Sequence, residues 1–277
     1  MGNQHSLNNV IHPTPAPVML NRRDFLKNGA LLGAATQLGF GGVFGLVQAP
    51  QGDDIPTMLN VAATAETFAC THYYQALTSK IKFTTAQLAY VKAALEEELV
   101  HLEFLNANGG KSLATSFYFP KGTFNTAQSF GSVSAIAETV FVGAYLAATR
   151  RFAELGNPLL AATAAQIAVI EGQHLALVRQ TAQELPNNIA YGEPSFYNVS
   201  DAVAAVQPIL DGKAGGLGEM DKVAVNYPGA DVIRKALGKS QLTVIKPFAD
   251  PTLFPVARAS AAPTAEPTAA STSAATP

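Results

Sequence analysis

The 277-residue chain contains no tryptophan, a single cysteine and few charged side chains. The lone Cys70 excludes an internal disulfide, so the fold must be stabilised by packing. Charged residues make up 14% of the chain and the formal net charge is -2, with no basic stripe interleaved with aromatic residues. Because nucleic-acid binding requires basic side chains that neutralise phosphates, we expect no nucleic-acid partner.

Apolar residues account for 48% of the sequence, which is enough for one sizeable core, and the two ends explain the remaining length. We predict four parts: a signal segment over residues 1–49, a helical bundle over 50–183, an extension packed on the bundle over 184–254, and a disordered tail over 255–277. The tail is almost entirely Ala, Pro, Thr and Ser. It has too few large apolar groups to offset the entropy of ordering it.

The amino-terminal segment contains two adjacent arginines, Arg22 and Arg23, followed by a mildly apolar run over 29–47. This arrangement resembles a twin-arginine export signal, with a small-residue cleavage site after Ala49. It implies export to the periplasm, the cell envelope or the medium. The alternatives are a general secretory signal and an uncleaved anchor, and only an uncleaved anchor would associate the protein with a membrane. The apolar run is too rich in glycine for a confident membrane span.

Between residues 55 and 183, apolar residues recur at helical spacing in four long segments separated by Gly, Pro and Asn. We expect helices over about 55–79, 85–108, 127–155 and 158–183. Short loops join the first pair and the second pair, whereas about twenty residues separate the two pairs, enough to run along a bundle. The sequence therefore predicts an all-α four-helix bundle with a long crossover between two helical hairpins, plus an irregular carboxy-terminal extension.

The first and third helices carry the same short pattern. Ala-Glu-Thr occurs around Glu66 and again around Glu138, and a tyrosine follows each glutamate by seven residues, at Tyr73 and Tyr145. A separation of seven places the tyrosine two turns from the glutamate on the same helix face. The repeat indicates a pseudo-twofold relationship between the hairpins.

The second and fourth helices repeat a Glu-x-x-His motif, at Glu98 with His101 and at Glu171 with His174. Residues at i and i+3 project from one helix face, so each motif presents a carboxylate and an imidazole to one point. Glu138 is the only charged residue between positions 133 and 149. An isolated carboxylate on such an apolar stretch is costly to bury and needs a compensating partner.

Metal ions would supply that compensation. The predicted ligands are four carboxylates and two imidazoles, contributed by four helices: Glu66, Glu98, His101, Glu138, Glu171 and His174. Divalent iron or manganese accepts such a set while keeping coordination positions open. The absence of a cysteine cluster argues against structural zinc, and the carboxylate excess favours harder metals than copper.

The order Glu, Glu-x-x-His, Glu, Glu-x-x-His on four helices resembles the ferritin-like di-iron carboxylate superfamily. The leader and the extension make it most similar to the exported branch that includes desiccation-related and stress proteins. The resemblance implies a centre of two iron ions, or manganese, with the six residues as ligands, and a hydrogen bond from Tyr73 to a ligand carboxylate; Tyr145 is its counterpart. The leader, the long extension and the lack of a recognisable short fifth helix differ from true ferritins, so a 24-subunit storage shell is not implied.

Other polar residues near the motifs have simpler interpretations. Glu96, Glu97 and Glu103 are typical of a solvated helix face. His72 lies six residues after Glu66, points elsewhere, and is expected to be structural or at the surface. Cys70 fits core packing, as free cysteines often do. The two tyrosines are consistent either with hydrogen bonds to ligands or with ordinary packing.

Two functional hypotheses follow. In the first, the protein is an oxidoreductase that uses dioxygen or peroxide, oxidising ferrous iron or, with manganese, disproportionating peroxide. In the second, it is a non-catalytic stress or envelope scaffold in which any metal is structural. Either would be compatible with a homo-oligomer. Metal content and stoichiometry would separate the two hypotheses.

Overall fold

The computed structural model describes residues 52–240 and 242–253. The predicted signal segment, 1–49, and the predicted tail, 255–277, lie outside the described residues. The long helices are α2 (Ile55–Thr78), α3 (Thr85–Ala107), α4 (Ala127–Glu154) and α5 (Pro158–Thr181). Their ends fall within about two residues of the positions predicted from apolar periodicity.

Local sequence signals define these helices. Asp54 caps α2 by accepting a hydrogen bond from the Thr57 amide, and Asn157 caps α5 in the same way. Helix α3 begins with a reciprocal capping box between Thr84 and Gln87. The turn from α4 to α5 contains Gly156 at φ +72°, a left-handed conformation that glycine adopts without steric cost.

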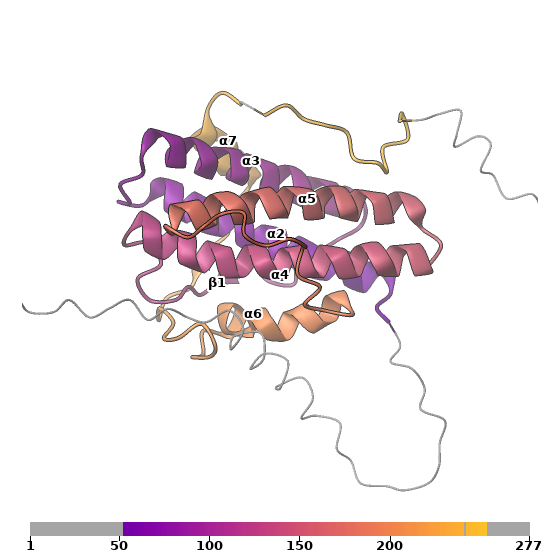
Figure 1. The fold of residues 1–277 in the computed structure, drawn as a ribbon, viewed down its shortest axis with the longest axis horizontal. Coiled ribbons are helices and arrows are strands. Elements are labelled where there is room, and N and C mark those ends of the chain that lie inside the picture. Colours follow the sequence, from indigo (N-terminus) through magenta and orange to yellow (C-terminus); the bar gives the residue numbers. More distant parts are fainter. Residues whose placement is uncertain (1–51, 241, 254–277) are drawn as a thin grey trace, which may run out of the picture.

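The long helices form two packed hairpins, α2 with α3 and α4 with α5 (Figure 1). Gly131 in α4 permits the close approach of the end of α5, because a Cβ atom there would lie 2.7 Å from the Val178 carbonyl oxygen and the Ala182 amide. The chain crosses from α3 to α4 through a long connection that contains β1 (Ser116–Phe117). The predicted fold class, a ferritin-like helical bundle, is confirmed.

The carboxy-terminal region packs around this bundle. It contains the short 3-10 helix η1 (Val199–Asp201), α6 (Ala202–Asp211), β2 (Val225–Asn226) and α7 (Ala230–Leu237). Helix α6 contacts α4 and β1, and α7 contacts α3. Strands β1 and β2 form an antiparallel pair, with Phe117 opposite Val225. The all-α prediction did not include this pair, because two-residue strands are too short to show an alternating pattern.

An extended segment follows α7 and lies along α5 (Figure 1). The Gln166 side chain accepts a hydrogen bond from the Phe248 amide at 2.6 Å, and the Thr163 hydroxyl accepts one from the Ala249 amide at 2.9 Å. These contacts hold the segment against the outer face of the helix, close to the site described below.

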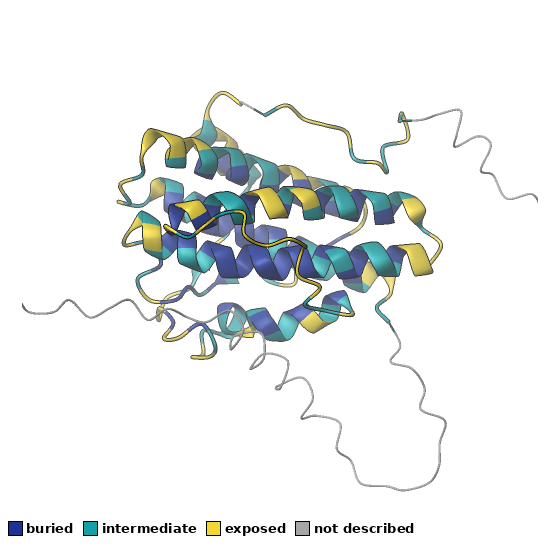
Figure 2. Ribbon diagram, viewed as in Figure 1, coloured by how far each residue is buried: buried dark blue, intermediate teal, exposed yellow. Residues whose placement is uncertain are grey.

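Buried residues concentrate on the inner faces of the long helices (Figure 2). One helix of the described part of the chain, α4, is long and apolar enough to cross a membrane. Its most apolar window is 78% buried inside the protein, as expected for the core helix of a bundle.

Candidate metal centre

Each long helix contributes one buried glutamate to the middle of the bundle. Glu66 comes from α2, Glu98 from α3, Glu138 from α4 and Glu171 from α5, and none is more than 1% exposed. Burial of the apolar residues around each glutamate stabilises the packing of the helices, and this packing also buries the carboxylates. The helices therefore bring four acids from distant parts of the sequence into one interior region.

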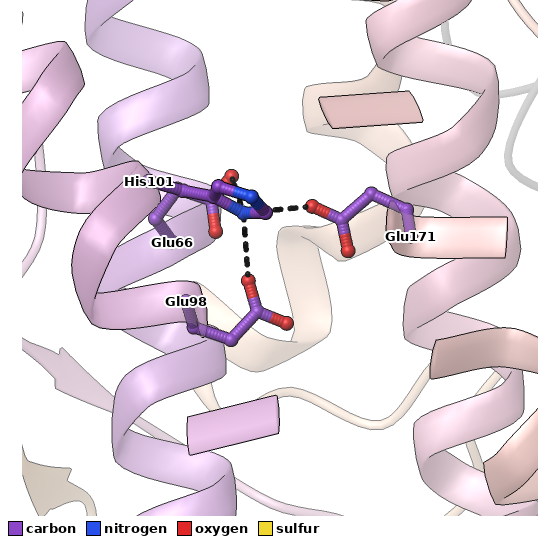
Figure 3. Close-up of side chains that lie close together, drawn as sticks. All are labelled: Glu66, Glu98, His101 and Glu171. Atoms are coloured by element: carbon purple, nitrogen blue, oxygen red, sulfur yellow. Dashed lines mark ion pairs between the residues drawn. The ribbon is translucent and has the colours of Figure 1, made fainter. Parts of the chain in front are cut away.

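His101 joins three of these acids in the first of two groups. Its Nδ1 atom lies 3.4 Å from a Glu171 oxygen, 3.5 Å from Glu98 and 3.8 Å from Glu66. Figure 3 shows the imidazole among the three carboxylates, with Glu171 reaching across from the other hairpin. One ligand atom from each of the four residues lies within 4.8 Å of the others, so this group could hold a metal ion.

His174 joins the second group. Its Nδ1 atom lies 3.0 Å from a Glu98 oxygen, 3.3 Å from Glu171 and 4.0 Å from Glu138. One ligand atom from each of these residues again lies within 4.8 Å of the others. Glu98 and Glu171 belong to both groups. In each of these two glutamates, one carboxylate oxygen lies near His101 and the other lies near His174. The six residues predicted as ligands are thus all brought together.

The groups contain many buried polar atoms without a hydrogen bond. They include both oxygens of Glu98 and Glu171, and Nδ1 of both histidines. Among the described residues, no lysine or arginine forms an ion pair with the four carboxylates. Buried charge without a partner is strongly unfavourable, and oxygen and imidazole donors suit divalent iron or manganese. The residues present therefore fit metal ions.

Burial and mutual repulsion dominate the electrostatics of the metal-free site. Burial, reinforced by the charges of Glu98 and Glu171, raises the pKa of Glu66 well above its usual value. Burial also raises the pKa of Glu138. Burial alone would lower the pKa of His174, but the surrounding carboxylates raise it well above its usual value. Without metal, the cluster therefore retains protons that a cation would displace.

Each predicted tyrosine bonds a glutamate of the opposite hairpin. The Tyr73 hydroxyl donates to Glu138 Oε1 at 2.5 Å, and the Tyr145 hydroxyl donates to Glu66 Oε1. Burial raises the pKa of both tyrosines, and nearby glutamates raise it further, so both hydroxyls stay protonated as donors. The sequence pattern indicated tyrosine and glutamate on one helix face; the structure shows that the contact is made between helices.

Glu97 differs from the expectation of a solvated residue. One of its oxygens lies 2.6 Å from His174 Nε2, and its side chain is 31% exposed. A carboxylate on the outer imidazole nitrogen fixes the ring and leaves the other nitrogen free to face a metal. The sequence offered one signal for this role, the i and i+4 spacing that places Glu97 on the same helix face as His101. That spacing could not identify His174 as the partner, because His174 lies on another helix.

The centre approaches the surface beside His101, whose side chain is 11% exposed compared with 2% or less for the other five predicted ligands. His101 and Glu97 line a pocket of about 370 Å³ between α3 and α5, which residues 242–245 and 247 also line. Val100 and Ile170 are among its apolar walls. This pocket connects the surface to the His101 side of the two groups.

The remaining neighbours are structural. His72 is buried, its Nε2 lies 2.8 Å from the Ser134 hydroxyl, and its ring stacks on Phe130. Burial lowers the pKa of His72 to about 3, so the ring is neutral. Cys70 is also buried, as core packing requires. At the surface, Glu103 pairs with Arg234 of α7.

Two helical hairpins with buried Glu and His clusters define a ferritin-like bundle with a potential metal site. Residues 54–184 match the family model described as "Ferritin-like domain", so this part of the chain has the ferritin-like fold. The matched region contains all six predicted ligands and both tyrosines. No curated protein and no solved structure matches the chain.

Proposed function

We propose that the ferritin-like domain holds two iron ions and oxidises ferrous iron with dioxygen or peroxide, as an exported protein of stress protection. The observation that carries this proposal is the sharing of Glu98 and Glu171 between two four-residue groups. Shared carboxylates would hold two ions close together, and a pair of ferrous ions would supply two electrons to one oxidant.

The chain's own residues have distinct roles in this proposal. Glu66 and His101 would complete the ligand set of one ion, and Glu138 and His174 would complete that of the other. Tyr73 orients the Glu138 carboxylate, and Tyr145 orients the Glu66 carboxylate, each through a hydrogen bond. The apolar helix faces around the site exclude bulk water, which strengthens the electrostatic interactions within it. The pocket beside His101 gives ferrous ions and oxidant access.

The direct test is the metal content of protein purified from its native compartment, followed by anaerobic ferrous titration of the metal-free protein. We expect two ferrous equivalents per chain and their oxidation when dioxygen or peroxide is added. The Glu98→Gln, Glu171→Gln double variant should lose both properties, whereas Glu96→Gln, which changes a glutamate outside both groups, should retain them. Binding of fewer than two equivalents by the unaltered protein would overturn the dinuclear proposal.

Manganese is the alternative metal, because it accepts the same ligands. With manganese bound, we expect peroxide disproportionation, which evolves oxygen and is measured directly with an oxygen electrode. The competing scaffold function predicts a different result for the double variant. If the protein is a scaffold, loss of metal in the double variant would lower its stability and would change no catalytic turnover, because the unaltered protein would have none.

Export by a twin-arginine route is part of the proposal and has its own test. The motif at Arg22 and Arg23 supports it. Replacing both arginines with lysine should leave the protein in the cytoplasmic fraction, whereas replacing Lys27 with arginine should not. Retention of the unaltered protein in the membrane fraction would instead favour an uncleaved leader.

A further inference from the structure

A second cavity lies on the opposite side of the bundle from the pocket beside His101. It has a volume of about 280 Å³ and is enclosed by α2, α4, α6 and the start of the crossover. Protein interiors normally contain few voids larger than a water molecule, so a cavity of this size between packed helices is unusual. It reaches the surface near Leu113, which is 68% exposed, and the half-buried Val206.

Small residues on the facing helices create this space. Ala62 and Ala65 of α2 and Ala144 and Ala148 of α4 line it, where larger apolar side chains would fill it. Helix α6 covers the gap from outside, with Val206 turned towards it.

The surroundings of the pseudo-symmetric tyrosine differ. Tyr145 lines the cavity, whereas the ring of its counterpart Tyr73 packs edge-on against Phe130 and His72. Both hairpins thus place a tyrosine at the same level of the bundle. Within residues 52–240 and 242–253, Tyr73 has aromatic rings packed against it, whereas Tyr145 has no such ring contact. The space beside Tyr145 is therefore a local feature of this half of the fold and does not follow from the repeat.

The lining defines what could bind. Apart from Thr64 and the Tyr145 hydroxyl, every lining residue is aliphatic or a phenylalanine. The Thr64 hydroxyl already donates to the Asn60 carbonyl and accepts from the Leu113 amide, and the Tyr145 hydroxyl donates to Glu66. Both side-chain hydroxyls of the lining are thus already engaged, and no lining side chain is charged. Sugars, nucleotides and ions would therefore lose most of their hydration without compensation.

We propose that this cavity is a binding site for one uncharged, hydrocarbon-like small molecule. An apolar cavity of about 150 Å³ stays dry and binds benzene, so a volume of about 280 Å³ suits a ligand of about two fused rings or an equivalent aliphatic chain. The ligand lies against the ring of Tyr145, which also contacts the metal-ligand candidate Glu66. This proposal does not depend on which metal, if any, the centre holds.

Naphthalene is a suitable probe, and equilibrium dialysis against the full chain measures its binding through its absorbance. We expect saturation at one naphthalene per chain. Naphthalene-2-sulfonate carries the same rings with a charge, and we expect it to bind at least about tenfold more weakly, because the cavity offers the charge no partner. Equal binding of the two probes would overturn the proposal, and so would an absence of saturable naphthalene binding for any reason, including another part of the chain filling the cavity.

Two variants test the location of the probe. Ala144→Phe fills the cavity from α4 and Val206→Phe fills it from α6, and each should weaken naphthalene binding at least tenfold. Ala86→Phe adds the same ring at an exposed position of α3 and should bind as the unaltered protein does. Thermal unfolding followed by circular dichroism identifies the folded variants. If one filled variant does not fold, the other decides, and unchanged binding in a folded filled variant contradicts the proposed location.

Discussion

The Tyr73 hydroxyl on α2 donates a 2.5 Å hydrogen bond to the Glu138 carboxylate on α4. The pseudo-symmetric bond runs the other way, from Tyr145 on α4 to Glu66 on α2. Each hairpin thus contributes one tyrosine that donates a hydrogen bond to a glutamate of the other hairpin. These two hydrogen bonds connect the hairpins at the level of the candidate metal site. They also orient Glu66 and Glu138, the two carboxylates that belong to only one group each.

Removing one of these hydroxyls should loosen one carboxylate. For Tyr73→Phe we expect about tenfold to hundredfold weaker binding of one metal ion, the range typical for residues that orient ligands. The metal-free protein should lose about 1 to 3 kcal/mol of unfolding free energy, because a buried acceptor loses its donor. Metal titration and thermal unfolding measure the two effects. Tyr191→Phe, at a tyrosine that is 86% exposed, is the matched control, and an equal effect there would contradict this prediction.

The shared carboxylates should differ from the unshared ones. Glu66→Gln and Glu138→Gln each change one group, so each variant should retain about one ion per chain. Glu98→Gln combined with Glu171→Gln changes both groups and should retain none. Elemental analysis after dialysis against ferrous or manganous ions gives the stoichiometry. A double variant that still binds two ions would show that the shared carboxylates are not ligands.

Glu97 should act on one ion only. Because Glu97 contacts His174 and no other predicted ligand, Glu97→Gln should weaken the ion of that group about tenfold or more and leave the other ion nearly unchanged. A two-site titration resolves the two affinities. The neighbouring Glu96→Gln is the control, and equal weakening of both sites by Glu97→Gln would indicate a general effect of surface charge instead.

The metal-free protein should lose stability as the pH rises from about 6.5 to 8. The carboxylates raise the pKa of His101 and His174, so the folded state retains protons that the unfolded state releases above its ordinary histidine pKa of about 6.5. Each retained proton gives a slope of about 1.4 kcal/mol per pH unit, and stability therefore falls as pH rises through the folded-state values. Denaturant unfolding at several pH values measures it.

Two comparisons support that pH experiment. Saturating metal should remove the decline, because bound ions displace the protons. The Glu98→Gln, Glu171→Gln variant should have a flatter profile, because it lacks two of the carboxylates that raise the histidine pKa values. An increase in the stability of the unaltered metal-free protein between pH 6.5 and 8 would contradict the prediction.

His72 should make the opposite contribution at acidic pH. Its folded-state pKa is lowered to about 3 by burial, so its contribution to stability is complete above about 6.5 and is lost as the pH falls towards 3. His72→Phe should therefore reduce the loss of stability between pH 6.5 and 3, while Ser134 keeps its hydrogen bond to the Phe130 carbonyl. Acid titration followed by circular dichroism measures the difference. An unchanged acid midpoint would indicate that other groups control it.

The sequence alone determined the helices and the identity of the acids inside them. Apolar periodicity, together with caps such as Thr84, is local, so it defined the four helices to within about two residues. Glu138 on a long apolar stretch could only be buried with compensation, and two Glu-x-x-His motifs on alternate helices indicated where that compensation would come from.

The packing of the helices determines which side chains meet. It places Glu98 and Glu171 in both groups, sends each tyrosine to the opposite hairpin, and brings Glu97 to His174. It also decides that alanines beside Tyr145 leave a cavity, because the position of α6 sets how far the gap is covered. These relationships join residues on different helices, and helix periodicity describes only the faces of single helices. Their distances depend on how the helices pack.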